Sequence, residues 1–225
     1  MSIFKTHVYI DDIIMRDLIN DNDLRFFRHQ KQVLNKMLDT DNGFIVKIDS
    51  WDYNTLLNDY EICNKIKHIN IIKPFCYFEF EFDILFYLGH TIRQEFQDIS
   101  VIISPYFQPI QMFLQDKQVI LQIINFMYVL FFKHGIGFKN FDINNIYVNS
   151  IEKPKTIKYI FNDVSYSLKT NNVVKFDDFC NSYRTTDTNY LIPNVKYVLN
   201  CFSKDCTFLS SEPMELLNEI HLFFI

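Results

Sequence analysis

The feature that most constrains the fold is the segment Val119–Phe132. If this segment forms a helix, the helix is apolar on nearly every side. Such a helix must be surrounded by other parts of the chain, because any face left in water would expose apolar area. Gln122 and Asn125 interrupt the segment, and it is shorter than the roughly 20 residues that span a membrane. We therefore expect a buried helix inside a lobe, ended by Gly135 and Gly137.

Most of the chain before this helix is predicted to form strands. A hairpin is expected where two apolar segments, Gln32–Leu38 and Phe44–Ile48, flank the turn Asn42-Gly43. Helical spacing predicts a helix over Asn54–Lys67, and a short helix is expected at Asp11–Leu24. Other apolar runs typical of strands are Ile69–Phe82, Ile84–Leu88 and Ile99–Ser104.

The second half is predicted to be mainly helical, with strands inserted. Ile146–Val148 is a short strand, and strand-like pieces over Tyr159–Asp178 are separated by the polar residues Lys169–Asn172. The last helices are expected at Val195–Phe202 and Pro213–Phe224. Because strands dominate the first half and helices the second, the sequence predicts an α+β fold with segregated elements.

Charge and cysteine content limit the classes of function. The net charge is −5 with no long run of one sign, so the basic face of a nucleic-acid-binding protein is not visible. The five cysteines are irregularly spaced, which is typical of reduced thiols. Met1–Ile10 holds charged residues and lacks a signal-peptide pattern. We therefore expect an intracellular, cytoplasmic protein that binds neither nucleic acid nor membranes.

Four segments resemble protein-kinase motifs, in the order that kinases have them. Phe44–Lys47 is similar to the strand whose lysine holds nucleotide phosphates. His68–Ile71 is similar to the turn after the helix that carries the glutamate partner of this lysine, and the spacing puts Asp59 at that position. Since aspartate is one methylene shorter, the resemblance implies a strained or water-bridged pair with Lys47. Glu61 lies about 200° further round the helix and cannot substitute.

The third segment, Gly135–Val148, resembles the kinase catalytic loop, which also follows a long apolar helix. Asn140 stands where kinases have the catalytic aspartate, and Asn145 keeps the metal-binding asparagine. Asp142 takes the place of a lysine that contacts the γ-phosphate, so it would repel that phosphate unless Mg²⁺ intervenes, or would act as a displaced base. The other matched positions are Phe138 for histidine, Lys139 for arginine and Phe141 for leucine.

The fourth segment, Val173–Cys180, resembles the strand that delivers the Asp-Phe-Gly motif, with Cys180 in place of glycine. The resemblance makes Asp178 the main magnesium ligand. The distance along the chain from the catalytic loop then requires an extra hairpin across Tyr159–Lys169. Asp163 is an alternative with better spacing but no following phenylalanine, and Asp178 is preferred.

Ile102–Phe107 resembles the strand and hinge that contact adenine, with Ser104 at the gatekeeper position and Tyr106 in the hinge. The resemblance implies one two-lobed, protein-kinase-like domain over all 225 residues. The strand-rich lobe and hinge would cover about residues 1–107, and a truncated helical lobe would cover residues 108–225. Small kinase-like proteins of large DNA viruses look similar, which would place this protein in the host cell cytoplasm.

The departures from the kinase pattern leave three hypotheses open. An amide at Asn140 is a very poor base, and general-base catalysis is worth about 10²- to 10⁴-fold. The segment Phe27–Gln32 also lacks the glycines that let backbone amides approach phosphates. A pseudokinase with a protein partner and weak or absent ATP and Mg²⁺ binding is the first hypothesis. A divergent Ser/Thr kinase that transfers the γ-phosphate of ATP to protein substrates is the second, and an unrelated α+β domain is the third.

Overall fold

The computed structural model has mixed helix and sheet with antiparallel strands, which confirms the predicted α+β class. The structure describes residues 5–6, 44–49, 53–88, 91–139, 141–177, 179, 182–202 and 210–224. The chain divides into two compact units, Met1–Ile66 with Ile72–Tyr106, and Lys67–Ile71 with Phe107–Ile225. Because the second unit takes in a short segment from the middle of the first, neither unit is a continuous stretch of chain.

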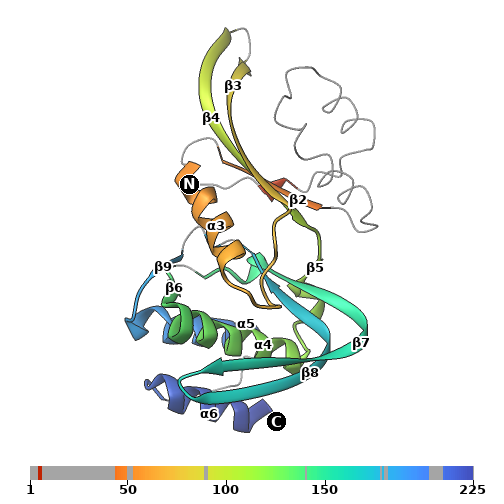
Figure 1. Cartoon of the computed structure of the whole chain (residues 1–225), viewed down its shortest axis with the longest axis vertical. Coiled ribbons are helices and arrows are strands. Elements are labelled where there is room, and N and C mark those ends of the chain that lie inside the picture. Colours follow the sequence, from red (N-terminus) through yellow and green to blue (C-terminus); the bar gives the residue numbers. More distant parts are fainter. Residues whose placement is uncertain are drawn as a thin grey trace. The chain divides into compact units, whose positions relative to one another are not determined.

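The first unit contains an antiparallel sheet and helix α3, Tyr53–Lys65 (Figure 1). The sheet order is β1-β2-β4-β3, with β1 at Lys5–Thr6, β2 at Phe44–Asp49, β4 at Thr91–Pro105 and β3 at Cys76–Leu88. Helix α3 contacts β2, β3 and β4. It matches the helix predicted from apolar spacing, since Leu56 and Cys63 on its apolar side are buried.

Strands β3 and β4 form one long hairpin. Cys76 is paired with Ile103 at its open end, and Leu88 is paired with Thr91 next to the turn. This corrects the prediction of two strands at Ile69–Phe82 and Ile84–Leu88, because β3 begins only at Cys76 and then continues without a break. Of the apolar residues before Cys76, Ile71 and Ile72 are buried, and Ile71 bridges Phe176 of β8 within the second unit. A run of apolar residues cannot by itself distinguish a strand from a buried connection.

Three predicted features lie outside the described residues. They are the helix Asp11–Leu24, the hairpin strand Gln32–Leu38 and the glycine-free segment Phe27–Gln32. On the side of β2 away from β4, Val46 and Lys47 pair with β1. At these two residues the neighbouring strand is therefore Lys5–Thr6 and not the hairpin strand that the sequence predicted.

The second unit is built around the apolar helix that the sequence predicted. Helix α4, Lys117–Tyr128, continues as a π-helical turn, η3, at Val129–Lys133. Every side chain from Val119 to Phe131 is buried. The helix begins after Asp116, whose Oδ1 accepts a hydrogen bond from the backbone N–H of Gln118 at 2.9 Å.

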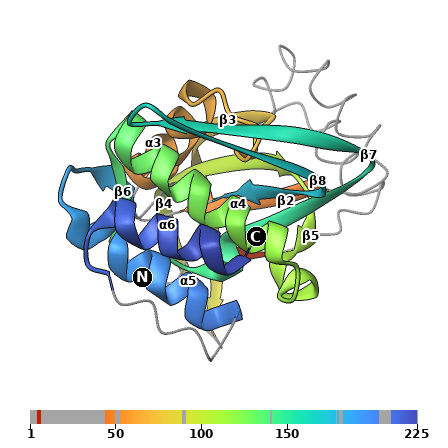
Figure 2. The same ribbon diagram turned by 90° about the horizontal axis from the view of Figure 1, so that it is seen from below.

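Two further helices pack on α4, and they confirm the helices predicted near the C-terminus. They are α5, Ile192–Phe202, and α6, Pro213–Phe224. Viewed from below, α4, α5 and α6 lie side by side (Figure 2). The shorter elements of this unit are β5 (Gln108–Pro109), η2 (Ile110–Phe113), η4 (Ile143–Asn145) and η5 (Thr188–Tyr190).

A long hairpin covers α4 on its other side. It consists of β7, Ile146–Phe161, and β8, Val164–Phe176, and β5 pairs with the far edge of β7. The turn residues Asn162 and Asp163 have φ angles of 44° and 61°, and Asn and Asp are among the few residues that tolerate these positive values in tight hairpin turns. The structure thus contains the extra hairpin predicted after the catalytic-loop-like segment.

The polar residues Lys169–Asn172 are part of β8 and do not interrupt it as predicted. Gln122 of α4 explains the difference, because its side chain bonds the backbone of β8 as a neighbouring strand would. Gln122 Nε2 donates to the carbonyl of Asn172 at 2.7 Å, and Gln122 Oε1 accepts from the N–H of Val174 at 3.0 Å. A buried polar residue of the helix therefore stabilises a polar strand.

The two glycines after α4 have different roles. Gly135 ends the helix as predicted, with a φ of 62° and its N–H donating to the carbonyl of Phe131 at 2.9 Å. Gly137 instead lies in strand β6, Ile136–Phe138, which pairs with β9, Ser182–Arg184. A Cβ atom at Gly137 would lie 2.6 Å from Cγ2 of Thr185, so a side chain here would push the neighbouring segment away.

Candidate functional site

Lys47 and Asp59 form a buried ion pair in the first unit. Lys47 lies in β2, Asp59 lies in α3, and Lys47 Nζ is 2.6 Å from Asp59 Oδ2. Both side chains are only 1% exposed. The sequence suggested a strained or water-bridged pair, whereas the contact is direct, because α3 packs closely enough on the sheet for the shorter carboxylate to reach the lysine.

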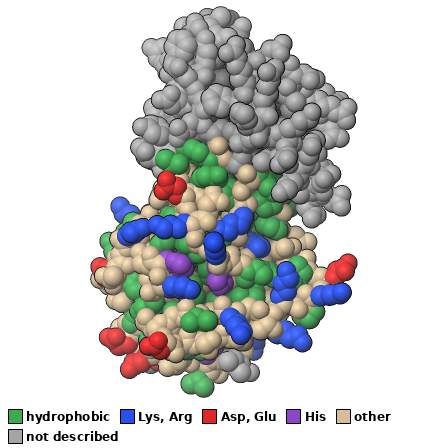
Figure 3. Space-filling model, viewed as in Figure 1, with side chains coloured by type: hydrophobic (Ala, Val, Ile, Leu, Met, Phe, Trp, Pro, Cys, Tyr) green, Lys and Arg blue, Asp and Glu red, His purple; other side chains and the backbone are tan. Residues whose placement is uncertain are grey.

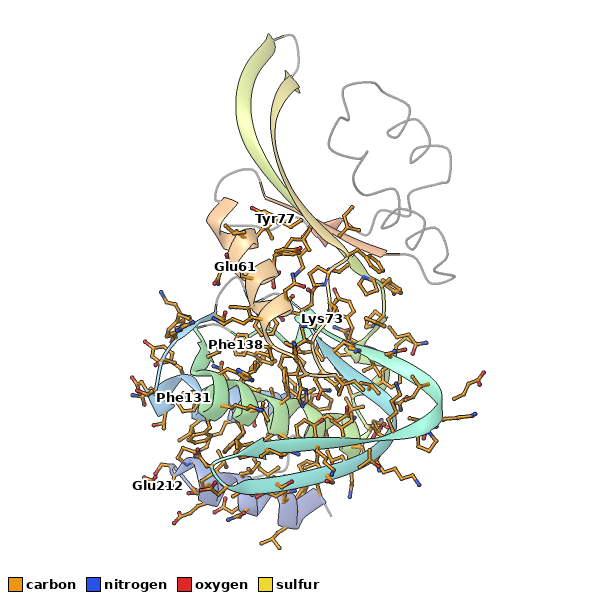
Figure 4. The ribbon with its side chains drawn as sticks, viewed as in Figure 1. Glu61, Lys73, Tyr77, Phe131, Phe138 and Glu212 are labelled. Atoms are coloured by element: carbon orange, nitrogen blue, oxygen red, sulfur yellow. The ribbon has the colours of Figure 1, made fainter. Side chains whose placement is uncertain are left out.

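The other carboxylate oxygen of Asp59 also has a neighbour. The thiol of Cys63, one helical turn further on, lies 3.5 Å from Asp59 Oδ1. Beside Asp59, the ring of Tyr60 stacks on Tyr77 of β3, with 5.3 Å between ring centroids. Glu61 is exposed on α3 (Figure 4), in agreement with the prediction that it cannot replace Asp59.

Ser104 and Tyr106 lie at the end of β4, the last strand of the first unit. Ser104 is 2% exposed and pairs with Ile45 of β2. Tyr106 follows the end of the strand and is half-buried. Their predicted role in binding adenine stays a prediction.

In the second unit, the segment that resembles the catalytic loop lies against the segment that resembles the Asp-Phe-Gly motif. Strand β6, within the first segment, pairs with β9, just after the second; Ile136 is opposite Arg184, and Phe138 is opposite Ser182. The N–H of Asp177 donates to the carbonyl of Asn145 at 3.1 Å. Two stretches that are far apart in sequence therefore form one local structure.

Aromatic side chains fill the space between these two segments. The ring centroid of Phe138 is 5.8 Å from that of Phe179 and 5.3 Å from that of Phe141. Phe141 also lies 6.0 Å from Phe176 and 6.4 Å from Tyr197 of α5. Phe138 replaces a histidine in the kinase pattern, and its burial against Phe179 shows that an apolar contact joins the segments here.

Asp142 and Asn145 occupy the two ends of a short 3₁₀ turn. The carboxylate of Asp142 is exposed, and its Oδ1 accepts from the N–H of Asn144 at 2.9 Å. Asn145 is half-buried at the start of β7. Asn140 and Asp178, the predicted catalytic-position residue and magnesium ligand, lie outside the described residues, although Asp177 beside Asp178 is buried.

The alternative magnesium ligand, Asp163, lies at the opposite end of the hairpin from Asn145. Asp163 is exposed in the turn between β7 and β8, whereas Asn145 immediately precedes β7. Asp163 therefore lies at the closed end of the hairpin and Asn145 at its open end.

Sequence reasoning missed a buried polar network behind this site. Asn70 Nδ2 donates to the carbonyl of Val174 at 2.7 Å, and the N–H of Phe176 donates to the carbonyl of Asn70 at 2.7 Å. Gln122 bonds the same stretch of β8, and both amide side chains are fully buried. The signal was available, since Gln122 is one of only two polar interruptions in the apolar helix segment.

Two features are absent from the described part of the chain, a metal-binding cluster and a membrane-spanning helix. No group of three or more His, Cys, Asp or Glu side chains in the described part of the chain is arranged to hold a metal ion. This absence does not test the predicted ligands Asn145 and Asp178, because asparagine is not one of these four residue types and Asp178 is not described. Among the described helices, none has both the length and the apolarity needed to cross a membrane.

In comparisons with known proteins, the sequence matches no protein-family model and no curated protein. The interpretation of this site therefore depends on its own residues and their geometry.

Proposed function

We propose that this protein is a pseudokinase, a kinase-like module that binds protein partners and binds ATP with Mg²⁺ weakly. The direct, buried ion pair between Lys47 and Asp59 carries the proposal. Protein kinases use a strand lysine paired with a carboxylate of the following helix to hold nucleotide phosphates. Lys47 and Asp59 have the same chain order and the same chemistry.

The energetics of this pair support a binding role for Lys47. Removing each ion from water costs several kcal/mol, and replacing a buried pair by apolar side chains is often neutral or stabilising. Stability alone therefore gives little reason to bury a lysine and an aspartate to 1% exposure. A lysine that must meet an anionic ligand gives a better reason.

Departures in the second unit favour binding over catalysis. The amide of Asn140 cannot take a proton from a substrate hydroxyl, and losing a general base lowers the rate by about 10²- to 10⁴-fold. Asp142, the displaced-base candidate, is exposed and accepts a hydrogen bond from Asn144 within its own turn. A carboxylate in that capping role is explained by local structure without any catalytic function.

A second candidate function is a divergent, active Ser/Thr kinase. The hydrogen bond from Asp177 to Asn145 favours it, because the residue next to Asp178 contacts the asparagine that would share Mg²⁺ with it. In this alternative, Lys47, Asn145 and Asp178 bind the nucleotide and the metal. The γ-phosphate of ATP is then transferred to a hydroxyl of a protein substrate.

Thermal unfolding in the presence of Mg-ATP tests the nucleotide site. A ligand at 100 times its dissociation constant should stabilise the protein by about 2.7 kcal/mol. We expect Lys47→Met to abolish this shift and Lys155→Met, which changes an exposed lysine of β7, to keep it. No shift for the unmodified protein at saturating Mg-ATP would contradict nucleotide binding.

Transfer of labelled phosphate to a generic protein substrate separates the two candidates. A pseudokinase should show the Mg-ATP shift without transfer. Transfer that Asp178→Ala abolishes would establish the active kinase instead. If transfer also survived Asn140→Ala but not Asp142→Asn, Asp142 would be the base.

A further inference from the structure

Lys73 binds the C-terminal end of α3 in the first unit (Figure 4). Its ammonium donates to the carbonyl of Cys63 and, at 2.7 Å, to that of Ile66, with the carbonyl of Asn64 at 3.4 Å. An ammonium has three N–H donors, and the last carbonyls of a helix lack partners within the helix. The cation also meets the negative end of the helix dipole.

The backbone beside Lys73 is fixed to the sheet. Two residues further on, the N–H of Phe75 donates to the carbonyl of Ile103 in β4 at 2.7 Å. Strand β3 then begins at Cys76 and pairs with β4 along its whole length. The Lys73 side chain therefore connects the end of the helix to the sheet that carries Lys47.

Cys63 links this helix end to the ion pair. Its carbonyl accepts from Lys73, and its thiol contacts Asp59 at 3.5 Å. The contact between Lys47 and Asp59, at 2.6 Å, tolerates little movement of the helix. A slip of α3 by one residue would move the carboxylate by about 1.5 Å and turn it by about 100°.

We propose that Lys73 is a positioning residue, whose bonds to the C-terminus of α3 keep Asp59 in contact with Lys47. The inference rests on the proposed function only where it concerns ligand binding: the charge of Lys73 would control the affinity of the Lys47 site for nucleotide phosphates. Position of the helix and affinity for nucleotide can be measured separately.

The test compares Lys73→Met with Lys73→Arg, which keeps the charge, and with Lys65→Met. Lys65 is an exposed lysine in the last turn of the same helix and is the matched control. The first readout is the rate at which iodoacetamide alkylates Cys63 in the folded protein without nucleotide, measured by peptide mass spectrometry. Cys63 is 3% exposed, and the half-buried Cys201 in the second unit is an internal reference for the reactivity of the reagent.

We expect Lys73→Met to raise the alkylation rate of Cys63 roughly tenfold or more, as loss of hydrogen bonds to a charged group implies. Cys201 should react as before, and Lys73→Arg and Lys65→Met should resemble the unmodified protein. The second readout is the dissociation constant for Mg-ATP, which should rise roughly tenfold for Lys73→Met alone. If Lys73→Met does not fold, Lys73→Gln gives the same comparison with a neutral donor retained.

An unchanged alkylation rate of Cys63 in Lys73→Met would overturn the proposal, whatever happens to nucleotide binding. Faster alkylation with an unchanged Mg-ATP affinity would overturn the link from Lys73 to the site. Faster alkylation in a protein that never binds Mg-ATP would support the positioning role and contradict the proposed function.

Discussion

At the scale of single residues, burial explains most of the unusual chemistry. Lys47 and Asp59 tolerate burial because each neutralises the other. His68 is a different case: it is a neutral, half-buried histidine of the second unit. Its ring stacks on Phe126 with 4.6 Å between centroids, and its Nδ1 accepts from the N–H of Asn70 at 3.2 Å.

The environment of His68 disfavours its protonated form. The pKa of His68 is lowered from 6.5 to about 4, mainly because burial disfavours the charged ring; a hydrogen bond to the Lys158 carbonyl opposes this, and the nearby charges of Lys133, His134 and Lys175 add to it. On one face of the molecule, histidine side chains lie beside lysine and arginine side chains (Figure 3). A proton on Nδ1 would also face the N–H of Asn70.

We predict that His68 makes the protein less stable in mild acid. Because the folded pKa lies below the unfolded value, the unfolded chain binds more protons between these pKa values. The contribution of neutral His68 to the free energy of unfolding is therefore complete above about pH 6.5, and it falls as the pH drops towards 4. Between pH 7 and pH 5 the loss from His68 should be about 2 kcal/mol.

Urea unfolding at both pH values measures this loss. His68→Phe keeps an aromatic ring against Phe126 and removes the titration, so its stability should change less between the two pH values. Equal changes in the two proteins would show that other groups account for the acid sensitivity.

At the scale of elements, the β7–β8 hairpin places the two candidate metal-binding segments, around Asp163 and Asp178, at its opposite ends. Its open end brings Asn145 and Asp177 together, and its closed end carries Asp163. Spacing along the chain favoured Asp163 as the partner of Asn145. Antiparallel pairing places Asp177 beside Asn145, because residues at the open end of a hairpin are far apart in sequence but paired in space.

We predict that Asp163→Gly stabilises the protein by about 0.5–1 kcal/mol, because Asn-Gly suits a turn with two positive φ angles better than Asn-Asp. Mg-ATP binding should be unchanged, since Asp163 is a turn residue. Chemical denaturation and Mg-ATP titration measure the two effects.

Asp163→Ala is the matched control, because it removes the same carboxylate without relieving the positive φ. Loss of magnesium-dependent binding in both variants, with Asp178→Ala silent, would identify Asp163 as the metal ligand.

At the scale of the whole molecule, the two units share the chain in an interleaved way. Lys67–Ile71 comes between parts of the first unit but belongs to the second. There it bonds β8, through Asn70 to Val174 and Phe176 and through the carbonyl of Ile69 to Lys175 at 2.6 Å. The segment covers an edge of β8 that would otherwise be open.

We predict that a fragment of residues 107–225 folds poorly on its own, because it lacks hydrogen bonds worth about 1 kcal/mol each along β8 and exposes a strand edge. A synthetic peptide of residues 65–73 should raise its melting temperature, and the same peptide with Asn70→Ala should do so less. Cooperative melting of the fragment with no response to either peptide would contradict this role.

The sequence by itself determined the elements whose pattern is strong and local. The apolar helix α4, the amphipathic helix α3 and both C-terminal helices follow from hydrophobic periodicity, which each segment carries alone. The α+β class follows from their order. Two strand predictions were wrong. One strand was predicted to begin at Ile69, which is too early, and another was predicted to be interrupted at Lys169. In both places residues distant in sequence supply the hydrogen bonds.

Tertiary structure alone decided which distant residues are in contact. The Lys47–Asp59 contact depends on how closely α3 packs on β2. The contact of Asn145 with Asp177 depends on the long hairpin between them. The hydrogen bonds of Lys73 and Gln122 join residues that no local sequence pattern relates. The physical reason is that a buried polar group needs a partner, but the partner can come from any part of the chain that folding brings near.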